Sequence, residues 1–410
     1  MSISELRLIY ESLKSKGLKL DMSRGKPCAE QLDLSCDMLN IDLGDYKSES
    51  GFDCRNYGLT FGLDEAKRLF EPIFGVASEN IIVGGNASLQ LIYDAVARAY
   101  TFGVSEKSDP WSTKPAKFLC PVPGYDRHFS ILETFGIEMI SVPLSKNGPD
   151  MEMTERLVAN DDNIKGMICV PMYSNPDGIT YSDEAVKRLA KMKTKAEDFR
   201  IFWDNAYGVH HLHDEPDKLL NIISECEKAG NPDRVYVFTS TSKITFAGGG
   251  ICAVGSSSSN IDYIKKNISM QTICFDKINQ LRHAKYFKNH DSITEHMKKH
   301  RAIIEPKFNI VFDMLEQELA PLNLGEWNKP RGGYFISFNG LKGTAKRTVE
   351  LCKQAGVIIT AAGATFPYGV DPEDKNIRIA PTYPPVSELI SAMEVFCASV
   401  KLASAELKQN

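Results

Sequence analysis

Short apolar runs that end in polar or glycine-rich turns recur through the middle of the chain. The clearest run, residues 235–238, follows an Asn-Pro-Asp turn and leads into hydroxyl residues and then Lys243. Similar runs occupy residues 81–83, 118–122, 166–170 and 199–203, with helical patterns between them. Strands that alternate with helices from about residue 80 to residue 240 predict an α/β fold with a mostly parallel, doubly wound sheet.

Polar or aromatic side chains directly follow these predicted strands. In a doubly wound sheet, ligands bind outside the carboxyl ends of the strands, so residues at those ends come together. The residues concerned are Asn86, Tyr125, Asn175, Asp204 and Lys243. Each position alone is weak evidence, but together they predict one site.

Lys243 stands at the exit of a buried strand, among hydroxyl residues and just before a Gly-Gly-Gly bend. A lysine there is costly unless its charge is paired, neutralised or used in chemistry, and clustered hydroxyls suit a phosphate. One interpretation is that Lys243 attaches pyridoxal phosphate covalently, with Ser240 and Ser242 near the phosphate. On this stretch alone, a solvated lysine at an ordinary strand end remains open.

The Gly84-Gly85 turn is followed by a predicted helix that Asn86 or Ser88 could cap. A helix start offers free N–H groups and a positive dipole end, both of which suit phosphate. The glycine spacing differs from the ATP-binding and dinucleotide-binding motifs. A plain strand–helix turn is the alternative.

A second unit begins after residue 330. Residues 331–338, 356–360 and 376–380 are predicted strands, and residues 387–403 a helix. Arg378 lies within the third of these strands, and a guanidinium binds carboxylates through two hydrogen bonds. We expect Arg378 to bind a substrate carboxylate, although a surface ion pair is equally compatible with its position.

Composition excludes several classes of function. Apolar residues make up 43% of the 410 residues, and the net charge of −5 gives no electrostatic reason to expect nucleic acid or an anionic membrane as partner. No apolar run approaches the roughly 20 residues that span a bilayer, and residues 1–10 do not resemble a signal peptide. Leu6, Ile9 and Leu13 predict a short amphipathic helix there instead.

The ten cysteines are scattered without a Cys-x-x-Cys pair, so we expect a reduced, cytoplasmic protein without disulfides. His210, His211 and His213 lack partners at metal-binding spacing, and we expect no metal site. Residues 105–117 are polar, contain two prolines, and form an excursion before the next strand.

Three motifs occur in an order that resembles the fold-type I pyridoxal-phosphate aminotransferases: Ser-Asn175-Pro-x-Gly, Asp204-x-x-Tyr207 and Ser240-x-Ser-Lys243. Residues 23–27, 120–129 and 239–245 further resemble the bacterial aspartate aminotransferases of subgroup 1c, often labelled MocR-type. The resemblance covers nearly the whole chain. It implies a large domain at residues 50–300, in which a mostly parallel sheet of about seven strands lies between helices. A smaller α+β domain would be formed by residues 1–49 and 301–410.

The resemblance also implies roles for single residues. Lys243 would carry the cofactor, pyridoxal 5′-phosphate, and later move the proton; Asp204 would pair with the ring nitrogen. Asn175 and Tyr207 would contact the phenolic oxygen of the ring, and Tyr125 would stack on the ring. The phosphate would be surrounded by Asn86, Ala87, Ser88, Ser240 and Ser242, and by Tyr57 of the neighbouring subunit in a homodimer. Arg378 and the backbone at Gly25 would hold the α-carboxylate, with Asn175 nearby.

The implied reaction is ping-pong transamination between aspartate and 2-oxoglutarate. An aromatic or kynurenine-like substrate, or β-elimination, remains an alternative, because the cation for a distal carboxylate is open among Arg24, Lys26, Arg55, Lys114 and Lys117. A non-catalytic sensor is the remote alternative, since about 20 residues before Asp21 leave no room for a DNA-binding domain. One departure stands out: the family's phosphate-binding arginine, eight residues after the lysine, is here Ile251.

Overall fold

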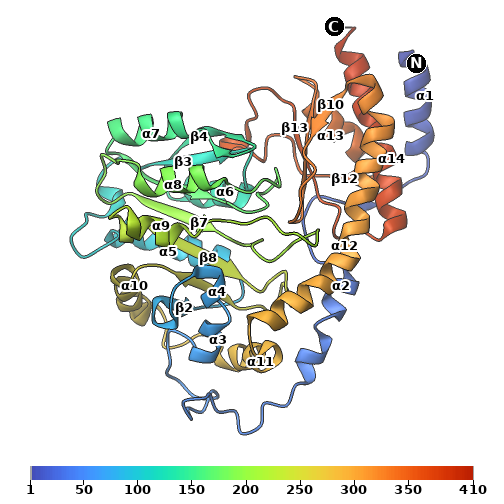
Figure 1. The fold of residues 1–410 in the computed structure, drawn as a ribbon. Helices are drawn as coiled ribbons and strands as arrows, with labels where there is room; N and C mark the ends of the chain where they lie inside the picture. Colours follow the sequence, from blue (N-terminus) through green and yellow to red (C-terminus); the bar gives the residue numbers. More distant parts are fainter. Residues whose placement is uncertain (1, 410) are drawn as a thin grey trace.

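The computed structural model describes residues 2–409, and its centre is a sheet of eight strands with helices on both faces (Figure 1). The strand order is β2-β9-β8-β7-β6-β3-β4-β5. The strands are β2 (Ile81–Val83), β3 (Lys117–Val122), β4 (Glu138–Ser145), β5 (Gly148–Pro149), β6 (Ile164–Cys169), β7 (Arg200–Asp204), β8 (Val235–Ser240) and β9 (Cys252–Gly255). Neighbouring strands from β8 to β4 are parallel, whereas β2, β9 and β5 pair antiparallel. The predicted mostly parallel sheet is confirmed, with the two-residue β5 added at its edge.

Helices bury both faces of this sheet, which explains why its central strands are apolar along their whole length. One face packs against α3 (Asp64–Arg68), α4 (Glu71–Phe74), α7 (Met151–Asn160), α8 (Asp183–Lys191), α9 (Ile222–Lys228) and α11 (Lys277–Phe287). The other packs against α5 (Ser88–Phe102), α6 (Asp126–Thr134) and α10 (Ser258–Gln271). In β7, Ile201 and Trp203 pack on the first of these faces and Phe202 on the other, as strand alternation requires.

A second apolar cluster lies around a three-stranded antiparallel sheet, β10 (Gly325–Trp327), β11 (Ile336–Gly340) and β13 (Asn376–Ile379). The remaining elements are β1 (Leu20–Asp21), which pairs with β12 (Val357–Ile358), and the helices α1 (Ile3–Lys14), α2 (Ala29–Asp33), α12 (His290–Glu318), α13 (Ala345–Gln354) and α14 (Val386–Leu407). The two ends of the chain lie close together, with α1 beside α14 (Figure 1).

Two predicted elements differ in detail. The strand expected at residues 331–338 begins only at Ile336, because Gly333 has a φ of +83° and packs against Tyr173 in a bend. The N-terminal helix buries Leu6 and Tyr10, while Ile9, expected on the apolar face, is exposed.

Helix α12 connects the two apolar clusters. Its first half places Ile293 and Met297 in the cluster under the large sheet, and its second half places Ile304 and Phe308 in the other. The predicted boundary at residue 300 therefore falls inside a continuous helix, and the domain boundaries stay a prediction.

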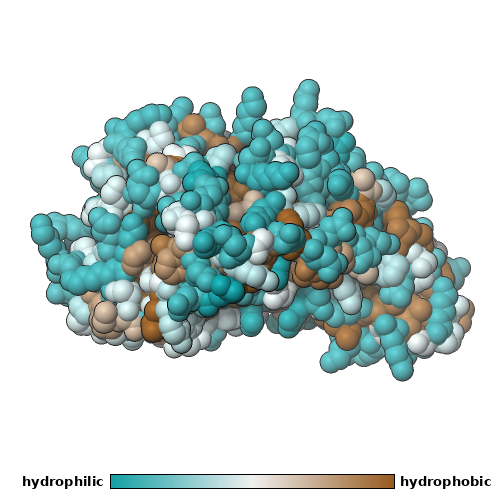
Figure 2. Space-filling view, turned by 90° about the horizontal axis from the view of Figure 1, so that it is seen from below, coloured by the Kyte–Doolittle hydropathy of each residue, from teal (hydrophilic) through white to brown (hydrophobic). Residues whose placement is uncertain are grey.

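Hydrophilic residues predominate on the face shown in Figure 2, with hydrophobic residues in scattered groups. Across residues 2–409, none of the helices combines the length and the apolar character that crossing a membrane requires.

Candidate active site

Lys243 follows β8 in a tight turn, and its Nζ lies 4.9 Å from the centre of the Tyr207 ring and 5.9 Å from that of Tyr334. Across residues 2–409, no carboxylate lies within 4.0 Å of this amine. Its charge is therefore faced by two aromatic rings rather than by an acid, which leaves the amine available for chemistry.

Asp204 ends β7 and is 4% exposed. Its Oδ2 accepts a hydrogen bond of 3.0 Å from Nε2 of His128, and its Oδ1 lies 3.5 Å from the Ser88 hydroxyl. His128 is equally buried on α6, three residues after Tyr125, and the Tyr125 and His128 rings meet edge to face at 4.9 Å. Sequence reasoning gave His128 no role, although its spacing from Tyr125 puts both on one side of the helix start.

The predicted phosphate residues come together where α5 begins beside the Lys243 turn. The Ser242 hydroxyl donates to the backbone oxygen of Asn86, whose side chain donates to the Ala247 carbonyl at 3.1 Å. Ala87 caps α5, and Ser88 is its first residue. Gly250 closes the group: a Cβ there would lie 2.9 Å from the Ser242 nitrogen and 3.1 Å from the Asn86 oxygen. Only glycine permits this approach of three backbone segments.

Ser240 and Ile251 flank this group. Ser240 is the last residue of β8, is buried, and pairs with Cys252 of β9. Ile251 donates its N–H to Thr241 Oγ1 at 2.9 Å, and its side chain is 1% exposed in the apolar cluster under the sheet. The side chain at position 251 thus belongs to the core.

Asn175, Tyr207 and Tyr125 line the other side of the site. Asn175 is buried, and its Oδ1 accepts from the Arg378 guanidinium at 3.2 Å. Burial raises the pKa of the Tyr207 phenol well above its ordinary value, and the negative charge of Asp204 raises it further. Burial likewise raises the pKa of Tyr125. Both phenols therefore stay protonated hydrogen-bond donors at neutral pH.

Arg378 is 5% exposed on β13. Its Nη1 lies 2.8 Å from Asp126 Oδ1, its Nε donates to Thr360 Oγ1 at 3.2 Å, and the guanidinium stacks over Phe335 at 5.0 Å. Gly25 packs against the same Phe335 ring, which a Cβ on Gly25 would approach to 2.5 Å. The arginine thus lies in a fixed position next to the Gly25 backbone.

Some of these residues, including Lys243, Tyr207 and Arg378, line a cavity of 430 Å³. It is lined by Ser23, Arg24, Gly25, Lys26, Tyr125, Asp126, Arg127, Asn175, Tyr207, Lys243, Phe335, Ile359, Thr360, Ala361, Ala364 and Arg378. Five of these residues are cationic, and Asp126 is the one carboxylate among them. The cavity is therefore suited to an anionic substrate.

The structure separates the five candidates for the distal carboxylate. Arg24 and Lys26 line the cavity, whereas Arg55 pairs with Asp53 at the surface. Lys114 and Lys117 were wrong candidates: Lys117 begins β3 and Lys114 precedes it, so both lie at the amino edge of the sheet, away from the site.

Tyr57 is not brought to the cavity of its own chain and is 72% exposed. Its expected role across a dimer interface stays a prediction. Of the three neighbouring histidines, His210 is buried beside Tyr207 and Tyr334, and His211 contacts the Tyr173 hydroxyl at 2.9 Å. Within residues 2–409, no group of three His, Cys, Asp or Glu side chains is arranged to hold a metal.

Comparison with known proteins identifies the fold and the family. The sequence profile of the family described as "Aspartate amino-transferase" matches residues 2–410. A Corynebacterium glutamicum protein named aspartate aminotransferase is 45% identical over 404 residues, which are 98% of this chain and 93% of that protein. A solved aspartate transaminase from the same species has a TM-score of 0.96 at 44% identity and covers 99% of this chain and 96% of its own.

More distant structures share the fold alone. The α-aminoadipate aminotransferase LysN of Thermus thermophilus, solved with N-(5′-phosphopyridoxyl)-L-leucine, has a TM-score of 0.77 at 17% identity and covers 96% of this chain and 95% of its own. The architecture is that of fold-type I pyridoxal-phosphate enzymes. The chain is therefore an aminotransferase and belongs to the aspartate aminotransferase family.

Proposed function

We propose that this aminotransferase uses pyridoxal 5′-phosphate to transfer an amino group from aspartate to 2-oxoglutarate, giving oxaloacetate and glutamate by a ping-pong mechanism. The excess of cations in the cavity favours aspartate as the substrate, because an amino acid with two carboxylates needs two cationic contacts. The name of the Corynebacterium glutamicum relative supports the same choice.

The residues present fit this cofactor. Asp204 offers a buried carboxylate, held by His128, to a protonated ring nitrogen. Ser88, Ser242 and the start of α5 offer hydroxyl and N–H donors to a phosphate, and Gly250 lets the backbone of Ser242 approach that of Asn86 at this point. Lys243 offers an amine without an acidic partner among the described residues. When bound, pyridoxal phosphate supplies an electron sink for the charge that develops at the substrate Cα.

The side chains then divide the work of the reaction. Arg378 binds the α-carboxylate through two hydrogen bonds, for which its contact with Asp126 must open or be shared. The Lys243 amine would act as the base that takes the proton from the substrate Cα, and its ammonium form would later return a proton. Asp204 would stabilise a proton on the ring nitrogen, and the protonated phenol of Tyr207 would donate to the ring oxygen.

Arg24 and Lys26 are the cations we propose for the distal carboxylate. Both line the cavity on the segment next to Gly25, and Lys26 Nζ lies 4.9 Å from the Tyr383 ring centre. Arg24 makes no ion pair with another described residue. A carboxylate bound here would lie in the same cavity as one bound by Arg378.

We also propose a homodimer in which Tyr57 reaches the phosphate of the neighbouring subunit. Tyr57, Met270 and Ile273 are 72%, 85% and 61% exposed, and the Thr60 hydroxyl donates to the Ile273 backbone oxygen, which brings the two segments together. Large apolar side chains gathered at a surface are typical of an interface. The subgroup 1c assignment rests on the sequence motifs, and a cytoplasmic location is supported by ten free cysteines.

The visible absorption spectrum of the purified protein tests this function. We expect a band of bound pyridoxal phosphate that L-aspartate converts to the pyridoxamine form and L-phenylalanine does not. Conversion by phenylalanine or kynurenine but not by aspartate would replace the substrate with an aromatic one. No band after pyridoxal phosphate is supplied would refute the cofactor and the function together.

A further inference from the structure

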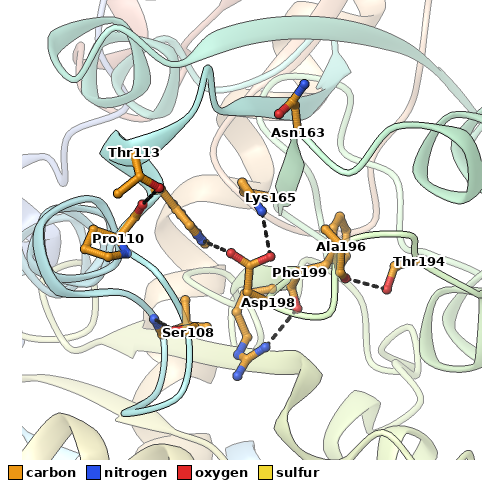
Figure 3. A network of polar contacts seen from close by, with 12 residues as sticks. Ser108, Pro110, Thr113, Asn163, Lys165, Thr194, Ala196, Asp198 and Phe199 are labelled. Carbon is orange, nitrogen blue, oxygen red and sulfur yellow. Dashed lines mark hydrogen bonds and ion pairs between the residues drawn. The ribbon is translucent and has the colours of Figure 1, made fainter.

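A second cavity, of 410 Å³, lies at the amino edge of the large sheet. One wall is formed by residues 104–114, the polar segment between α5 and β3. The opposite wall comes from Lys165 on β6, from Glu197 and Asp198 before β7, and from Arg200 on β7. Figure 3 shows this region, with Ser108 and Thr113 on one side and Lys165 and Asp198 facing them. The proposed reaction uses none of these residues.

Arg200 is the buried charge of this cavity. It begins β7 and is 6% exposed. Its guanidinium donates to the backbone oxygen of the preceding Phe199 at 3.1 Å, and its Nε has no hydrogen-bond partner among the described residues. Nor does any carboxylate in residues 2–409 lie within 4.0 Å of it. A buried guanidinium is normally paired with an acid, so one that lines a cavity without such a pair indicates a missing anionic partner.

The neighbouring acid is already engaged. Asp198 accepts from Lys165 Nζ at 2.8 Å through one oxygen and from the Trp111 indole at 3.0 Å through the other (Figure 3). Arg234 lies nearby, where its guanidinium donates to the Ala190 and Met192 backbone oxygens. It also forms no ion pair with an acid in residues 2–409. Burial lowers the pKa of Arg234, and the positive charge of Arg200 lowers it further.

The charges at the rim balance. Lys107 and Lys114 are exposed and make no ion pair with another described residue, and Asp109 and Glu197 are exposed acids. The lining as a whole has four cations and four carboxylates. The lining therefore has no net positive charge to attract an anion, and a ligand would be held by direct hydrogen bonds to Arg200.

We propose that this cavity is a second ligand site, which binds a small molecule through an oxyanion group, a carboxylate or a phosphate, on Arg200, with Lys114 closing over it at the rim. Arg200 and Asp204 are the first and last residues of β7, about 13 Å apart along the strand. The site therefore lies at the opposite edge of the sheet from Lys243 and is distinct from the place of substrate and cofactor.

Calorimetric titration of the holoenzyme tests this proposal. The bound cofactor then already fills the proposed phosphate-binding site near Ser242. Inorganic phosphate and acetate are the two probes, at constant ionic strength set with chloride. We expect at least one of them to bind with one site per chain, and Arg200→Gln to weaken that binding at least about tenfold. Binding of phosphate alone assigns a phosphate ligand, and binding of acetate alone assigns a carboxylate. Acetate that binds at Arg378 should still bind in Arg200→Gln. Only the part of the binding signal that is lost in this variant is therefore assigned to the second site.

Two further variants serve as a second test and as a control. Lys114→Ala changes an exposed residue without a described partner, so it should fold normally and still weaken binding two- to threefold or more. Lys193→Ala removes an exposed lysine outside the lining and should bind as wild type. The proposal is overturned if neither probe binds, or if Arg200→Gln and Lys114→Ala both bind as tightly as wild type. Transaminase activity is not the readout, so failure here leaves the proposed function untouched.

Discussion

His283 should make the stability of the protein, and with it the turn that carries Lys243, sensitive to mild acid. The ring lies buried on α11, with Nδ1 2.8 Å from the Asn279 carbonyl. A carbonyl can only accept, so Nδ1 bears the proton and Nε2 of the neutral ring accepts. Nε2 lies 3.0 Å from the hydroxyls of both Thr241 and Thr245, on either side of Lys243. Protonation would turn this acceptor into a donor inside the core.

The size of the effect follows from the pKa. Burial lowers the pKa of His283 from 6.5 to about 4. Between pH 6.5 and pH 4 the unfolded chain therefore binds a proton at His283 that the folded chain does not bind. The free energy of unfolding is unaffected by His283 above pH 6.5 and falls as the pH drops from 6.5 to 4. The whole difference is about 3 kcal/mol, of which about 2 kcal/mol is lost by pH 5. Burial also lowers the pKa of His300 to about 4, which adds a loss of similar size.

Urea denaturation at pH 7.5 and at pH 5.0, at one protein concentration, measures this loss. We expect His283→Gln, which cannot titrate, to reduce the pH-dependent loss of unfolding free energy by about 2 kcal/mol. His213→Gln removes an exposed imidazole and serves as the control. If His283→Gln and wild type lose the same stability between the two pH values, the neutral, hydrogen-bonded state assigned to His283 is wrong.

Three substitutions test the active site directly. Lys243→Ala should lower kcat at least about a hundredfold while circular dichroism stays unchanged, and turnover at the wild-type rate would exclude Lys243 from proton transfer. Gly250→Ala places a Cβ 2.9 Å from the Ser242 nitrogen, so cofactor affinity should fall about tenfold in a fluorescence titration, whereas Gly248→Ala, in open space, should retain it. His128→Phe leaves Asp204 Oδ2 without its donor and should lower kcat about tenfold or more with KM little changed; a KM effect alone would assign His128 to packing.

The sequence predicts the large sheet well because its strands are buried on both faces and therefore read as unbroken apolar runs. Residues at the ends of those strands, such as Asn175 and Asp204, could be grouped for the same reason, since parallel strands end at one edge. The same rule could have removed Lys117 from the list of substrate cations. Lys117 begins its strand rather than following it, and so lies at the opposite edge of the sheet.

Contacts between distant segments could not be predicted in this way. Arg378 and Asp126 are 252 residues apart, and their contact depends on how the second cluster packs against the first. The pairing of His128 with Asp204 likewise requires α6 to cross the end of β7. Arg200 gave no signal either, because an arginine near the start of an apolar run is ordinary until its lack of an acidic partner can be seen.

Ile251, which stands where the family has a phosphate-binding arginine, contacts the same hydroxyl as His283. Its side chain lies in an apolar cluster, so an arginine in the same position would have to bury a charge there, at a cost of several kcal/mol. Its N–H donates to Thr241 Oγ1, the hydroxyl that His283 also contacts, and Gly250 beside it packs against Ser242 and Asn86. The side of the site that we propose for the phosphate is thus built from neutral hydrogen bonds and close backbone packing. A proton on His283 acts on those same hydrogen bonds, and for this reason we expect cofactor retention to weaken in the pH range in which the fold loses stability.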